Sequence, residues 1–152
     1  MSKRAHLIAG MLATLCIATF FLSTIIIELF GSHAAVAQLK SLIVTPGLWI
    51  MVPLMAAAGG SGMFLAKSRK GRLVEAKKGR MPFIAANGLL VLVPCAILLS
   101  RWAGTGFFDT TFYVVQVIEL AAGATNFTLM SLNARDGMRM VGRLRNGPPA
   151  AT

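Results

Sequence analysis

The sequence has few charged residues, and acidic residues are the scarcest. Only 13% of the 152 residues are charged, and five Asp and Glu stand against fifteen Lys and Arg. Soluble domains carry about 25% charged residues. Together with a 56% hydrophobic content and a mean hydropathy of +0.72, this excludes an ordinary soluble domain and indicates a membrane protein.

Residues that carry most catalysis and metal binding are also scarce. The chain has two Cys and two His, and both Cys16 and Cys95 lie inside apolar runs. No CxxC pair and no Cys/His cluster occurs, so neither a disulfide framework nor a metal site is expected. A Gly-x-Ser-x-Gly motif is missing as well. We therefore expect no catalytic residues, and a protein that is not an enzyme.

Long apolar runs occupy most of the chain. A helix needs ~20 apolar residues to cross ~30 Å of hydrocarbon. The first run exceeds the ~7–15 residues of the apolar core of a signal peptide, so an uncleaved span is favoured over cleavage after Ala37. We predict an all-α, up-down bundle of four transmembrane helices as a single domain at 1–134, followed by a basic, flexible cytoplasmic tail at 135–152. The expected spans are residues 7–30, 40–66, 82–103 and 111–133.

The basic residues are distributed unevenly between the connections. Thirteen of the fifteen Lys and Arg fall at residues 3–4, 67–80 or 135–145, and only Lys40 and Arg101 fall on the other side of the predicted spans. Basic residues concentrate on the cytoplasmic side of membrane proteins. The distribution predicts that both termini are cytoplasmic, and we expect a multi-pass protein of a bacterial inner (plasma) membrane.

The basic connection between the second and third spans is expected to contact anionic lipid headgroups. Nucleic acid is not an expected partner, because no aromatic residues interleave with these charges to stack on bases. An acidic protein partner is the alternative. The residues concerned are Lys67, Arg69, Lys70, Arg72, Lys77, Lys78 and Arg80.

The last span carries an acid well inside its apolar run, Glu119. Hydrocarbon penalises a carboxylate, so we expect Glu119 to face other protein, with Lys40, Gln116, Thr45 or Arg101 as its partner. The acid could lock the bundle, handle protons or ions, or contact a ligand. It belongs to a line of residues three or four apart, which share one helix face: Gln116, Glu119, Gly123, Asn126 and Met130. Asn87 of the third span is also expected to face inward.

The histidines raise the alternative of a haem protein, since helical bundles can hold haem between facing side chains. His6 and His33 lie at opposite ends of the first span, ~40 Å apart at the helical rise of 1.5 Å per residue, and cannot both bind one iron in a monomer. His33 with a Met, or His33 from two subunits, remains possible. No cofactor is predicted, and haem b is kept as an alternative.

The function we expect from the sequence is that of an accessory, assembly or interaction subunit of a membrane complex. Small residues at 56–62 and 121–124 permit close approach of a second helix, from another membrane protein or from another copy of this chain. One alternative is a small proton- or ion-coupled carrier centred on Glu119. The other is a haem-b electron-transfer protein that uses His33.

Overall fold

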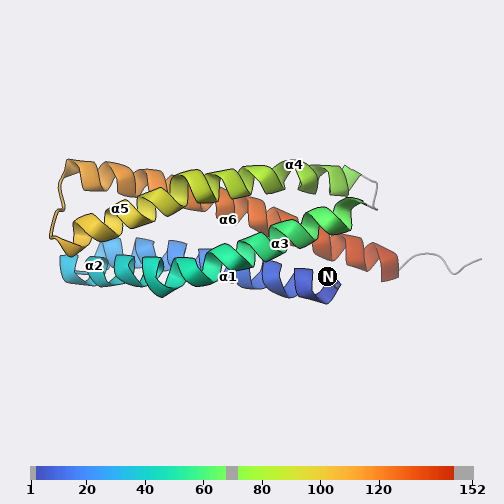
Figure 1. The fold of residues 1–152 in the computed structure, drawn as a ribbon, viewed down its shortest axis with the longest axis horizontal. Helices are drawn as coiled ribbons and strands as arrows, with labels where there is room; N and C mark the ends of the chain where they lie inside the picture. The colour runs from blue at the N-terminus through green and yellow to red at the C-terminus, as the bar shows by residue number, and fades with distance from the viewer. Residues whose placement is uncertain (1–2, 68–71, 146–152) are drawn as a thin grey trace, which may run out of the picture.

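The computed structural model describes residues 3–67 and 72–145, and all the regular elements within these ranges are helical. The elements join end to end into four long rods (Figure 1). The first rod is α1 (Lys3–Phe30), and the fourth is α6 (Thr110–Arg145). The second rod consists of α2 (His33–Leu42), η1 (Ile43–Leu48) and α3 (Trp49–Lys67). The third consists of α4 (Arg72–Asn87), η2 (Gly88–Leu92) and α5 (Val93–Gly104). The segments η1 and η2 are π-helical.

Each rod contains a stretch long and apolar enough to cross a membrane. These stretches are His6–Phe30, His33–Phe64, Gly79–Gly104 and Thr110–Arg139. Large apolar side chains such as Phe30, Trp49 and Leu90 are exposed on the outside of the rods, as expected where lipid replaces water as the surrounding solvent. The predictions of an all-helical chain, four apolar spans and a multi-pass membrane protein are thereby confirmed.

The rods lie side by side, and their connections divide the molecule into two ends. At one end, named here the short-loop end, residues 31–32 join α1 to α2 and residues 105–109 join α5 to α6 (Figure 1, left). The start of α1 and the far end of α6 lie at the opposite end, named here the terminal end. Within the bundle α1 packs on α3 and α6, α2 packs on α5, and α4 packs on α6.

The second rod is broken at Pro46. A proline lacks the backbone N–H and clashes with the carbonyl four residues earlier, so it often kinks or breaks a helix. Thr45 leaves the helical region, with φ −136° and ψ 114°, and α2 and α3 meet across this kink. Pro53, the second proline of this rod, lies inside the uninterrupted α3.

Gly47 allows α1 to pack closely against this break. It is buried, and a Cβ atom there would lie 2.8 Å from Cζ of Phe20 and 2.9 Å from the Leu42 carbonyl oxygen. Carbon atoms in contact are normally about 3.5–4.0 Å apart. The missing side chain is therefore what lets Phe20 of α1 reach the broken backbone.

Two helices are longer than the sequence pattern predicts. Residues 72–80, expected to belong to a loop, form the first half of α4, and α6 continues to Arg145 through the first part of the expected flexible tail. Neither Gly79 nor Gly137 ends its helix, since an isolated glycine lowers helix stability by only about 1 kcal/mol. An ion pair between Arg80 and Asp136 also ties the two extensions together.

Replacing Gly47 with Ala should destabilise the bundle by about 1–3 kcal/mol, the usual effect of overpacking. Gly60→Ala is the matched control, because a Cβ at Gly60 meets nothing within 4 Å. That change should be neutral or slightly stabilising. Thermal unfolding of both variants in one detergent measures the difference, and equal melting temperatures would show that the contact of Phe20 with Gly47 is not tight.

Candidate functional site

A buried ion pair joins the second rod to the fourth. Nζ of Lys40, in the last turn of α2, donates a hydrogen bond to Oε2 of Glu119 in α6. The Lys40 side chain is 0% exposed and that of Glu119 is 11% exposed. Two charges removed from water are tolerated only when each pairs with the other, so this pair fixes α2 against α6.

Gln116 completes the surroundings of Glu119 on α6 itself. It lies about one turn earlier on the same face, and its Nε2 donates to Oε2 of Glu119 over 3.0 Å. The residue is only 3% exposed. Its carbonyl oxygen, Oε1, is buried and accepts no hydrogen bond from the part of the chain that the structure describes. One acceptor beside the ion pair is therefore left unsatisfied.

A second acid, Glu28 of α1, belongs to the same cluster. Its carboxyl group lies within electrostatic reach of Lys40, Glu119 and His33. Its Oε1 is buried and has no hydrogen-bond partner among the described residues. The site, named here the acid–lysine cluster, thus contains Glu28, Lys40 and Glu119. Two carboxyl groups share one buried lysine, and His33 is a second basic residue within electrostatic reach of Glu28.

A hollow of about 60 Å³ lies beside Glu119, which is the one member of the cluster among its lining residues. The other polar residue of the wall is Thr24, which lies one turn before Glu28 on α1. A water molecule needs about 10–15 Å³ of such space, so the hollow has room for several waters or for one small organic group. Its remaining lining is apolar: Ile17, Phe20, Phe21, Ile43, Leu48, Met51, Leu92, Ala96, Leu120 and Gly123.

Farther along α6, toward the terminal end, two asparagines join α4 to α6. Nδ2 of Asn87 donates to Oδ1 of Asn126 over 2.8 Å and to the Ala122 carbonyl over 2.9 Å. Nδ2 of Asn126 in turn donates to the Ile84 carbonyl over 3.3 Å. Asn126 is 0% exposed. Neither asparagine has a buried side-chain atom without a hydrogen-bond partner in the described structure, which suits a structural lock better than a binding site.

The terminal end carries further polar contacts that sequence reasoning did not identify. Arg80 donates to Asp136 over 2.8 Å, and Nδ1 of His6 lies 2.8 Å from Oγ of Ser61. Asn133, seven residues after Asn126 on the same face of α6, lies 3.5 Å from Arg80. The regular spacing of Glu119, Asn126 and Asn133 was a usable signal. The contacts of Arg80 and Ser61 join segments that are distant in the sequence, so no regular spacing of residues indicates them.

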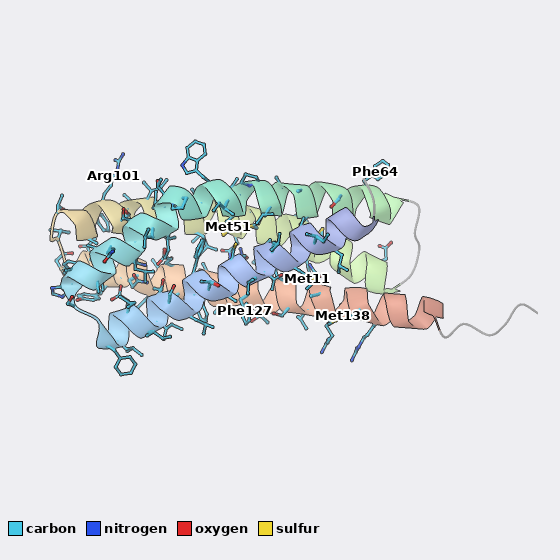
Figure 2. The ribbon with its side chains drawn as sticks, turned by 90° about the horizontal axis from the view of Figure 1, so that it is seen from below. Met11, Met51, Phe64, Arg101, Phe127 and Met138 are labelled. Atoms are coloured by element: carbon cyan, nitrogen blue, oxygen red, sulfur yellow. The ribbon has the colours of Figure 1, made fainter. Side chains whose placement is uncertain are left out.

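Three other predicted residues, Thr45, Arg101 and His33, are exposed, and of these His33 is within electrostatic reach of Glu28. Thr45 is exposed at the helix break, and Arg101 is exposed and points away from the bundle (Figure 2). His33 is exposed and stacks on Phe108, with ring centroids 4.1 Å apart. Among the expected headgroup contacts, Arg80 instead binds Asp136, with 27% of its side chain exposed. The other six residues of that set lie outside the described side chains: Lys67, Arg69, Lys70, Arg72, Lys77 and Lys78.

Glu28 was not among the residues singled out from the sequence. An acid near the end of a span is usually solvated, and nothing in the local pattern of α1 says that α2 and α6 cover it. Groups of three or more potential metal ligands are also missing from the described ranges 3–67 and 72–145. The acid–lysine cluster is thus a site of charge and hydrogen bonding.

The fold and this cluster define the class: a multi-pass membrane protein with four candidate membrane-spanning helices and a buried charged site between them. Comparison of the chain with protein-family models, with curated proteins and with solved structures gives no match.

The cluster predicts an asymmetry between two substitutions. Lys40→Met leaves both carboxylates without a cation and should destabilise the fold by roughly 3–5 kcal/mol, as for other broken buried pairs. Glu119→Gln should be milder, because Glu28 remains near Lys40 as a second counter-charge. Unfolding of the two single variants and the double variant in detergent measures these effects, and equal losses for the single variants would exclude Glu28 from the cluster.

Proposed function

We propose that this chain is a small proton- or ion-coupled carrier whose central group is the acid–lysine cluster around Glu119. The observation that carries the proposal is the second carboxyl group of the cluster: Lys40 pairs with Glu119, and Glu28 lies within electrostatic reach of both. A carboxylate buried without a cation is strongly disfavoured in a medium of low dielectric constant. The cluster therefore has a physical reason to take up one further positive charge, as a proton or as a cation.

The break in the second rod supports this proposal. In many membrane transporters the binding site lies beside helices that are interrupted within the membrane, because interrupted backbone can line a cavity. Here Lys40 lies five residues before the non-helical Thr45, and both Ile43 and Leu48 of the broken segment line the hollow. The charged site and the irregular backbone thus meet in one place.

We propose an orientation with both termini in the cytoplasm. Thirteen of the fifteen basic residues then lie on the cytoplasmic side, as the positive-inside rule requires. The short-loop end, with Glu28 in the last turn of α1, faces the other side of the membrane. Glu119 lies nine residues into α6, about 13 Å along the helix axis from its start at Thr110.

Proton movement by the purified chain in liposomes tests the carrier. An imposed pH gradient, with a potassium potential to balance charge and a pH-sensitive dye inside, should collapse faster than in empty liposomes. Glu119→Gln should bring the rate down to that of empty liposomes, because it removes the charge that holds Lys40 in place. Glu75→Gln, an exposed acid of α4 far from the cluster, is the matched control and should keep the wild-type rate.

If the gradient decays equally in wild type, Glu119→Gln and empty liposomes, a proton-carrying function is wrong. The same liposomes with a gradient of sodium or of potassium in place of the pH gradient then test whether the chain carries either of these ions. A carrier of any of these species is excluded if none of the three gradients decays faster than in empty liposomes.

A second candidate function, the accessory or assembly subunit, is favoured by one face of α3. Pro53, Ala56 and Gly60 are exposed and lie three or four residues apart, so they share a narrow face without large side chains. A Cβ at Gly60 would meet nothing within 4 Å. The other small-residue segment, 121–124, is largely used inside the bundle, where Gly123 packs on Phe21. The face on α3 would suit a helix from a partner protein or from a second copy.

Affinity purification from native membranes tests this second candidate. A defined partner, or a second copy, should be recovered with the wild-type chain and lost with Gly60→Leu, because the added side chain fills the face. Gly10→Leu is the control, since Gly10 is another membrane-facing glycine with open space around its Cβ. Recovery of the wild-type chain alone, as a monomer, would contradict an accessory function.

A further inference from the structure

We propose that the terminal end of the bundle binds the phosphate group of an anionic membrane phospholipid between α4 and α6. The residues that bind it are Arg80, Arg135 and Arg139, together with Asp136, and they are named here the arginine site. This site lies at the opposite end of the bundle from Glu28 and the acid–lysine cluster (Figure 1). Nothing in it depends on the carrier function.

A single carboxylate holds two arginines of different helices together. Nη1 of Arg80 in α4 donates to Oδ2 of Asp136 over 2.8 Å, and Nε of Arg135 in α6 lies 3.9 Å from Oδ1 of the same group. Nη1 of Arg80 also donates to Oδ1 of Asn133 over 3.5 Å. The side chain of Asp136 is 5% exposed, whereas those of Arg80 and Arg135 are 27% and 54% exposed. The acid is therefore an internal anchor that keeps two guanidinium groups near each other at the surface.

The positive charge of the arginine site exceeds its negative charge. Arg139 is exposed one turn after Arg135 on α6, so the site contains three arginines and the one carboxylate of Asp136. Arginine stays protonated at physiological pH and presents its N–H donors in a planar fork that matches two oxygens of a phosphate. Within the described ranges, the hydrogen bonds of Arg80 all come from Nη1, so its other N–H groups are available to a ligand.

The arginine site lies where the apolar stretches of both rods end. The stretch of the third rod begins at Gly79, next to Arg80, and that of the fourth rod ends at Arg139. Lipid phosphates lie at this boundary, and basic pockets between membrane helices bind anionic headgroups. Phe83, about one turn farther into the apolar stretch, and Met138, on the outer side of α6 (Figure 2), are largely exposed. Apolar side chains open to acyl chains thus accompany the arginines, which suits a lipid better than a free phosphate ion.

The charges of the site favour an anionic lipid over a zwitterionic one. Phosphatidylcholine carries a phosphate and an ammonium group, and the ammonium would meet the positive charges of the arginines. The carboxylate of the site, Asp136, is buried and already paired with Arg80, so it does not offer the ammonium a counter-charge. Phosphatidylglycerol carries the same phosphate without a cation. Its single negative charge complements the excess positive charge.

Native mass spectrometry of the full chain in a neutral detergent tests the proposal, with phosphatidylglycerol and phosphatidylcholine of identical acyl chains added in equal amounts. We expect one phosphatidylglycerol per chain to bind at least about tenfold more tightly than phosphatidylcholine, because one charge-assisted hydrogen bond changes an affinity by about that factor or more. Arg135→Gln should remove most of this preference. The fold should survive the change, since the bond between Arg80 and Asp136 stays in place.

Three further variants separate the arginine site from general surface charge. Arg135→Lys keeps the charge but loses the planar fork, so it should bind phosphatidylglycerol several-fold more weakly than wild type. Arg139→Gln, which takes part in none of the hydrogen bonds of the described site, should also weaken binding. Arg101→Gln removes an equal charge from an exposed residue at the short-loop end and is the matched control, with wild-type binding expected.

A soluble competitor separates the lipid from a free phosphate ester. Glycerophosphoglycerol, the headgroup of phosphatidylglycerol without acyl chains, should not displace the bound lipid at equal concentration. Displacement would show that a soluble phosphodiester is the ligand and would overturn the lipid assignment. Equal affinity for the two lipids, equal affinity of Arg135→Lys and wild type, or equal loss in Arg135→Gln and Arg101→Gln would each overturn the proposal as a whole.

Discussion

The pairing of Lys40 with Glu119 is the interaction on which the arrangement of the bundle depends. Charges within a membrane-spanning bundle have no water to stabilise them, so each must face another polar group inside the protein. The pair joins α2 to α6 across the interior, and Gln116 holds the carboxylate from its own helix. Because Lys40 sits on a short helix that ends at a break, its position depends on how α2 joins α3. Gly47 and Phe20 set that junction by their close contact.

The cluster differs from a simple structural lock in its composition. A lock such as Asn87 with Asn126 leaves no buried side-chain atom without a partner in the described structure. Around Lys40, by contrast, two carboxylates accompany one ammonium, and two buried oxygens remain unpartnered in the described structure. A protein that needed only rigidity would be served as well by hydrophobic packing. This composition is the reason for proposing a site that exchanges a positive charge with its surroundings.

Much of the architecture followed from the sequence, because hydrocarbon imposes simple rules. The four spans could be located from apolar run length, and the polar face of α6 from residues three or four apart, as Gln116, Glu119 and Asn126 show. Lys40 could be named as a partner of Glu119 because few cations lie near that depth. Glu28 could not, since its environment is made by two distant helices. The helical extent of α4 and α6 was also missed, because Arg80 and Asp136 pair across more than fifty positions of sequence.

Polar residues on one face of α6 bond to neighbouring helices at three positions along its length. Glu119 bonds to α2 near the short-loop end, while Asn126 and Asp136 bond to α4 at and beyond the middle. Two of the three attachments therefore fasten α6 to the same neighbour, and they prevent it from turning about its axis or sliding along α4. Helices α4 and α6 are thus joined through side chains at two depths, whereas the broken rod reaches the polar face of α6 through Lys40.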